Sequence, residues 1–181
     1  MSLHYEWILS IRLRLDTPES FLDELRFHLG MTDQCPAEPS LECDWPCLLP
    51  DQDAALPGGA IRSLVHQQPY LDHPGPLGLY VRTFLLDDGL YELIQTVPAW
   101  LAPWSLTQGW IGHAREEFDL YPWLYFYVQD GHAYAAEPGR SPKPLQGNAP
   151  PFTLTQTTDL PPGPPGPGPH AVATRRVGPA A

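Results

Sequence analysis

The chain has 181 residues, of which 43% are hydrophobic and only 17% are charged. Its formal net charge of −11 would repel nucleic acid and anionic lipid, so we expect neither as a partner. No apolar run approaches the roughly 20 residues of a membrane-spanning helix. The Met-Ser start leads straight into a strand pattern without the features of a signal peptide. These properties predict one acidic, cytoplasmic domain, and the 24 prolines indicate an additional irregular segment.

Two regular elements are indicated at the start of the chain. Residues 5–15 (YEWILSIRLRL) alternate between apolar and polar side chains, which predicts a strand with its odd-numbered residues facing the core. The following residues predict a helix, because Thr17 is a suitable cap, Pro18 fits the first helical position and Gly30 is a natural terminator.

Residues 89–102 fit two interpretations. Asp88-Gly89 between apolar runs is a hairpin signal. The apolar residues from Leu90 onward nevertheless repeat at helical spacing, which a strand would scatter over both faces. We therefore expect a helix with Asp88 as its N-cap, kinked or interrupted at Pro98.

The remaining residues divide into strands and irregular segments. Residues 31–59 lose all periodicity and form a loop that holds three cysteines. Apolar-rich runs predict the other strands, which cover 60–66, 79–87 and 109–117 and a hairpin over 123–135 with its turn at Asp130-Gly131.

The order of these elements predicts an α+β fold. We expect a ferredoxin-like βαββαβ antiparallel sheet with two helices on one face and an additional C-terminal β-hairpin. Its first and third strands should lie in the centre, and the domain should cover residues 1–137. Residues 138–181 hold twelve of the 24 prolines and predict a disordered Pro/Gly-rich tail, although residues 150–158 (PPFTLTQTT) could add a short edge strand.

The three cysteines form a C-x7-C-x3-C pattern at Cys35, Cys43 and Cys47. The pattern as a whole matches no standard zinc spacing, because such sites combine a C-x2–4-C pair with a second pair of ligands. His28 or His66 would be the fourth ligand of a zinc site. In a cytoplasmic protein we instead expect three reduced thiols, with no metal and no other cofactor.

Several arginines should lie on the sheet face that the helices leave open. They are compatible with a small anionic ligand, because arginine matches the geometry of carboxylate and phosphate. They are also compatible with cross-strand ion pairs to Glu6, Glu116 or Glu117, and we favour this second interpretation. The candidate ligand-binding residues are Arg12, Arg14, Tyr80, Arg82 and Arg115.

An imidazole and three carboxylates, the groups that acid–base chemistry uses, fall together at His113, Glu116, Glu117 and Asp119. On a strand, however, His113 and Arg115 share one face while Glu116 and Trp110 belong to the other. The four candidate catalytic groups would therefore converge only if the strand bulged.

The final predicted hairpin is apolar on both faces, which indicates that a partner subunit or the tail covers its outer face. No Gly-rich phosphate loop and no nucleophile elbow is present in the sequence. We therefore expect a small, soluble, non-catalytic binding domain that acts through the open face of the sheet. Its partner would be another protein, a second copy of the chain or a small anion. The alternative is an enzyme that uses a carboxylate, histidine and arginine site on a small substrate.

Overall fold

The computed structural model describes residues 3–51, 57–67, 75–145 and 149–153. These residues form two α-helices, one 3-10 helix and seven strands. In chain order they are β1 (His4–Arg12), α1 (Glu19–His28), β2 (Ile61–His66), β3 (Leu77–Leu86), α2 (Asp87–Leu101), the 3-10 helix (Ala102–Trp104), β4 (Gly109–Glu116), β5 (Leu124–Gln129), β6 (His132–Ala136) and β7 (Lys143–Pro144). Neither α-helix in these parts of the chain is long and apolar enough to cross a membrane.

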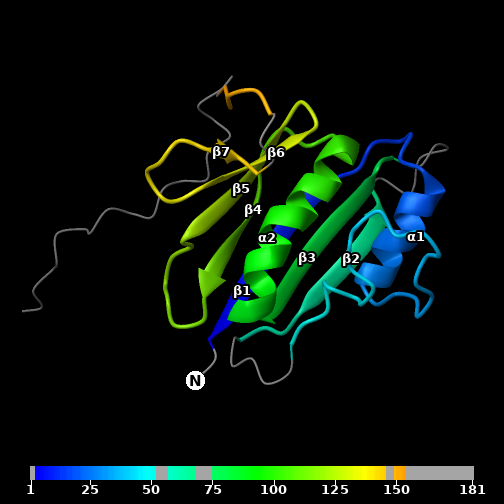
Figure 1. The fold of residues 1–181 in the computed structure, drawn as a ribbon, viewed down its shortest axis with the longest axis horizontal. Helices are drawn as coiled ribbons and strands as arrows, with labels where there is room; N and C mark the ends of the chain where they lie inside the picture. The colour runs from blue at the N-terminus through cyan, green and yellow to red at the C-terminus, as the bar shows by residue number, and fades with distance from the viewer. Residues whose placement is uncertain (1–2, 52–56, 68–74, 146–148, 154–181) are drawn as a thin grey trace, which may run out of the picture.

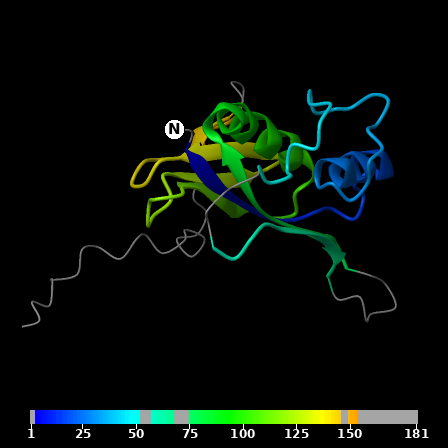
Figure 2. The same ribbon diagram turned by 90° about the horizontal axis from the view of Figure 1, so that it is seen from below.

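All seven strands belong to one antiparallel sheet, with the order β2-β3-β1-β4-β5-β6-β7. Helices α1 and α2 lie over one face of this sheet (Figures 1 and 2). The predicted α+β class is therefore confirmed, and β1 and β3 have central positions between β2 and β4. The strand order differs from a simple βαββαβ arrangement, because β5, β6 and β7 extend the sheet beyond β4.

The core fills the space between the sheet and its helices. Trp7 and Leu9 of β1 are fully buried in it, together with Leu25 of α1 and Leu90 of α2. The period-two pattern of the first strand predicted this burial, but the strand ends at Arg12 and Leu15 is 76% exposed. Leu13 is still buried and donates to the Leu77 carbonyl oxygen of β3, but the chain then turns, with the Thr17 N–H donating to the Arg14 carbonyl oxygen. The prediction of a strand to residue 15 was therefore wrong.

The termini of the two helices follow local hydrogen bonding. At the end of α1, Gly30 has a φ of 63° and the Met31 N–H donates to the Arg26 carbonyl oxygen, which is the Schellman arrangement. The helical interpretation of α2 is confirmed. Its N-cap is Leu86, not Asp88, and the helix continues through Pro98, because a buried face holds it against the sheet.

The β5–β6 hairpin turns at Asp130-Gly131 as predicted, and both residues have positive φ. Its outer face is covered by residues 149–153 of the same chain. The Phe152 ring centroid lies 5.1 Å from that of Tyr134, and the Tyr134 hydroxyl donates to the Pro150 carbonyl oxygen at 2.8 Å. A segment that the proline content predicted as tail therefore packs on the sheet. Residues 154–181, including most of the possible edge strand, lie outside the described residues.

Candidate functional site

A buried carboxylate, Glu6 on β1, lies between two arginines on the open face of the sheet. Arg82 on β3 donates from Nε to Oε1 at 2.6 Å, and Arg115 on β4 donates from Nε to Oε2 at 2.9 Å. Burial of Glu6 favours its neutral form, but the hydrogen bonds from Arg82 and Arg115 outweigh burial and lower its pKa below the ordinary value. Glu6 is therefore an ionised junction that joins three neighbouring strands.

Both arginines also donate to backbone carbonyl oxygens. Arg82 donates to the carbonyl oxygens of Pro57 and Gly59 at 2.7 and 2.8 Å, and Arg115 donates to the carbonyl oxygen of Asp119 at 3.0 Å. The predicted pairing of arginines with Glu6 is present, and it occupies the centre of the open face.

The other predicted acidic partners lie elsewhere. Glu117 is 3.6 Å from the Nδ1 atom of His4. Glu116 on β4 pairs with Tyr5 on β1, and the Tyr5 side chain is in the core. The Glu116 side chain therefore lies on the helix side of the sheet. Neither forms an ion pair with an arginine among the described residues.

The four candidate catalytic residues are not brought together. His113 lies on the open face, whereas Glu116 lies on the opposite one, and Asp119 contacts Arg115 only through its backbone. Strand β4 does bulge, but between Trp110 and Gly112, which precedes the acidic residues. The bulge puts Trp110 on the same face as His113, so the prediction that the two residues lie on opposite faces was wrong. The Trp110 ring stacks on the His113 ring, with 6.1 Å between the ring centroids. Burial lowers the pKa of His113 below its ordinary value.

The two arginines of the first strand pattern have different environments. Arg14 lies beyond the end of β1, where it forms an exposed ion pair with Asp16 at 2.6 Å, so its predicted place on the sheet face was wrong. Arg12 lines a groove of about 430 Å³ on the open face, together with Tyr80 and Trp110. None of the described residues that line this groove is acidic, although the chain as a whole is.

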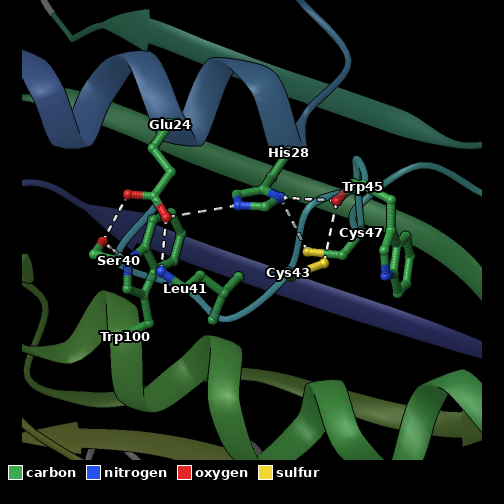
Figure 3. A network of polar contacts seen from close by, with 8 residues as sticks. All are labelled: Glu24, His28, Ser40, Leu41, Cys43, Trp45, Cys47 and Trp100. Carbon is green, nitrogen blue, oxygen red and sulfur yellow. Dashed lines mark hydrogen bonds and ion pairs between the residues drawn. The ribbon is translucent and has the colours of Figure 1, made fainter. Parts of the chain in front are cut away.

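A second polar cluster lies on the helix side of the sheet, between α1 and the loop that follows it (Figure 3). The nitrogen and sulfur ligand atoms of His28, Cys43 and Cys47 all lie within 4.8 Å of one another. The Cys47 Sγ atom is 3.4 Å from His28 Nδ1, and Cys43 Sγ donates to the Trp45 carbonyl oxygen at 3.1 Å. Burial lowers the pKa of His28 and raises the pKa of both thiols.

Glu24 extends this cluster along α1. It is 3% exposed and accepts hydrogen bonds from the Ser40 hydroxyl at 2.6 Å and from the Leu41 N–H at 2.7 Å. Its Oε1 atom is 3.8 Å from the Nε2 atom of His28, one helical turn away. Trp100 of α2 completes the network by donating to Ser40 at 2.7 Å (Figure 3).

Part of this cluster was predicted from the sequence. Two of the three candidate cysteines are in it with His28, whereas Cys35 is exposed and His66 contacts the Gly75 carbonyl oxygen on β2's side of the molecule. Glu24 was not among the predicted residues. The signal that could have found it is its spacing of four residues from His28, which puts both side chains on one face of a helix.

A cleft of about 670 Å³ lies beside this cluster, between α1, the loop and α2. Phe21, Trp100 and Trp104 give it aromatic walls, and Glu38 and Glu42 contribute carboxylates. Its charge is therefore opposite to that of the groove around Arg12, and an anion would be repelled from it.

Comparisons with protein-family models, with curated proteins and with solved structures give no match to this chain. Function is therefore inferred from the geometry of these residues.

Proposed function

We propose that the chain is a non-catalytic binding domain and that the groove around Arg12, on the open face of the sheet, binds a small organic anion. The Arg12 guanidinium is the observation that carries this proposal. Among the described arginines it is the one without an ion pair or a side-chain hydrogen bond. An exposed arginine at the end of a central strand, without an acidic partner among the described residues, is available for a carboxylate or phosphate group.

The surroundings of Arg12 support the same ligand class. Tyr80 and Trp110 offer aromatic surface beside the guanidinium, and Ser63 and Thr107 offer hydroxyl groups. A volume of about 430 Å³ is in the usual range of small-molecule sites. We do not propose catalysis, because His113 and Glu116 lie on opposite faces of the sheet.

Binding can be tested by titrating the labelled full chain with benzoate and with neutral benzamide while amide chemical shifts are recorded. We expect benzoate to shift the amides of Arg12, Tyr80 and Thr107, and benzamide to leave them unchanged. The Arg12→Ala variant should lose the response and Arg14→Ala should keep it. Equal responses to both compounds, or an unchanged response in Arg12→Ala, would contradict the proposal.

A specific observation favours self-association as a second candidate function. Strand β2 is the edge of the sheet, and its Ile61 and Val65 side chains are 44% and 59% exposed. β2 carries no acidic residue, so two copies of this acidic chain would not repel each other there. Light scattering should show a dimer that Val65→Lys converts to a monomer, whereas Leu120→Lys, at an 83% exposed position, should not. A monomeric parent chain at high concentration would exclude this candidate.

We make two further proposals, one on the fold and one on the location of the protein. We propose that β2, β3, β1 and β4 with the two helices form a ferredoxin-like unit, which the central positions of β1 and β3 support.

We also propose a cytoplasmic location, which the free thiols of Cys43 and Cys47 support, because neighbouring thiols in an oxidising compartment form a disulfide. Labelling of the denatured protein from fresh lysate should find three free thiols.

A further inference from the structure

We propose that His28, Cys43 and Cys47 bind one zinc ion, which joins the end of α1 to the loop that follows it. Zinc is bound by thiolate and imidazole groups in a tetrahedral arrangement. Zn–S and Zn–N bonds of about 2.3 and 2.0 Å separate the sulfur and nitrogen atoms by about 3.5 Å. The distance from Cys47 Sγ to His28 Nδ1 is 3.4 Å, and the Cys43 thiol is in the same group of atoms.

The hydrogen bonding of His28 favours a metal at Nδ1. A neutral imidazole carries a hydrogen on one nitrogen only. If Nδ1 donates to the Trp45 carbonyl oxygen at 3.2 Å, the lone pair of Nε2 faces the Glu24 carboxylate, which repels it. If Nε2 carries the hydrogen instead, the Cys47 thiol can donate to the lone pair of Nδ1, but that lone pair also faces the Trp45 carbonyl oxygen at 3.2 Å, which repels it. A zinc ion bonded to Nδ1 removes both conflicts.

Glu24 then has a defined part in the site. A histidine that binds a metal through one nitrogen usually donates from the other to a carboxylate, which fixes the ring. Glu24 lies on that side of His28, with Oε1 3.8 Å from Nε2, and it is held by Ser40 and the Leu41 N–H. Among the described residues it has no arginine or lysine partner. We infer that Glu24 is a positioning residue for His28.

The fourth position of the zinc ion would be filled by an oxygen atom. The Trp45 carbonyl oxygen is already within 3.2 Å of both His28 Nδ1 and Cys43 Sγ. A cavity of about 70 Å³ that Cys43 and Trp45 line also has room for a water molecule. Either oxygen completes four-coordinate zinc, so the three side chains suffice.

A structural need for this ion comes from the loop. The described residues between α1 and Pro57 form neither helix nor strand, so few backbone hydrogen bonds hold them. Zinc would fix both Cys43 and Cys47 to α1, and its binding energy would add to the stability of the fold because the site does not exist in the unfolded chain. The ligands release their thiol protons as the zinc ion binds.

The metal content of the full chain tests the proposal. Protein expressed with added Zn²⁺ and dialysed extensively should contain one zinc ion per chain by elemental analysis. Cys43→Ser and Cys47→Ser should each lose it, and Cys35→Ser, the matched control, should keep it. Replacement by Co²⁺ should give the absorption bands of thiolate-bound tetrahedral cobalt, and these bands should be absent from Cys47→Ser.

The parent chain provides a test that does not depend on how the variants fold. A chelator should remove the zinc ion and lower the melting temperature, and added Zn²⁺ should restore both. The proposal is wrong if the parent chain contains no stoichiometric zinc, if Cys35→Ser loses as much metal as Cys47→Ser, or if Cys43 and Cys47 are found as a disulfide in protein purified under air.

Discussion

Glu6 and Glu24 are buried to almost the same degree, at 4% and 3% exposure, but on opposite faces of the sheet. Glu6 on the open face has a guanidinium group on each side. The described polar neighbours of Glu24, on the helix side, are a hydroxyl group, a backbone N–H and a histidine at 3.8 Å. Burial alone therefore does not distinguish the roles of two carboxylates, and the charges around each of them do.

The surroundings of Glu6 indicate a structural role, whereas the surroundings of Glu24 are compatible with the binding of a cation. The negative charge of Glu6 is compensated within the chain, so its network holds β3, β1 and β4 together and needs no ligand. Among the described residues, Glu24 has no arginine or lysine beside it, and it belongs to the same cluster as two thiols and an imidazole. The zinc ion that we propose would bring a cation to the helix side of the sheet.

The largest expected effect is that of Glu6→Ala. Removing this carboxylate leaves two partly buried guanidinium groups without their partner, and breaking such a buried pair costs about 3–5 kcal/mol. The free energy of unfolding in urea measures this loss. The control is Glu137→Ala, which removes a carboxylate from a largely exposed pair with Arg140 and should cost under about 1 kcal/mol. Equal losses in the two variants would show that the Glu6 network is not structural.

The same network should make the protein sensitive to acid. The pKa of Glu6 is lower in the folded state than its unfolded value of 4.5, so its contribution to stability is complete above pH 4.5. The contribution is lost as the pH falls through the folded pKa, because the protonated carboxyl no longer attracts the arginines. The stability difference between the parent chain and Glu6→Gln should therefore shrink from about pH 7 to about pH 3. A difference that stays constant with pH would assign the effect to packing.

The residues of the open face were predicted from the sequence more accurately than those of the helix side. The reason is that strand alternation is a local pattern, whereas the cluster on the helix side depends on contacts between segments that are distant in the sequence. Strand alternation put Arg82, Arg115 and Glu6 on one face, and their pairing follows from neighbouring strands. The polar cluster of Glu24, His28, Cys43 and Cys47 depends on where the irregular loop packs against α1. Neither hydrophobic periodicity nor secondary-structure propensity specifies that place. The C-x3-C pair and the Glu24–His28 spacing can each be recognised in the sequence, but the contact between them in the fold cannot be predicted from it.

Other differences depend on contacts between segments that are distant in the sequence. The β5–β6 hairpin is covered by residues 149–153 through aromatic packing, and β7 extends the sheet by pairing with β6. The alternation pattern of β4 does not indicate the bulge at Trp110. The bulge reverses the face of one residue, and this reversal places an indole in the groove around Arg12.

A smaller effect is expected on the helix side from Glu24→Gln. The amide keeps the shape of the side chain but not its charge, so it holds the Nε2 hydrogen of His28 less strongly. Loss of such a carboxylate weakens metal binding by about tenfold or more, which corresponds to about 1.4 kcal/mol. Competition with a zinc indicator measures the affinity, and the cobalt–thiolate bands should remain in the variant. Unchanged affinity would exclude Glu24 as the positioning residue, while zinc binding by the cysteines would still stand.

The smallest effect is expected from Phe152→Ala, which tests how firmly the chain covers its own open face. Phe152 is partly buried, with its ring centroid 5.5 Å from that of Tyr127 and 5.1 Å from that of Tyr134. Removing a half-buried phenyl ring should cost about 1 kcal/mol. Urea unfolding gives this value, and Phe118→Ala, at a position that is 72% exposed, should give almost none. If both variants are as stable as the parent chain, residues 149–153 add nothing to the fold, and the aromatic outer face of β5 and β6 is available to a partner.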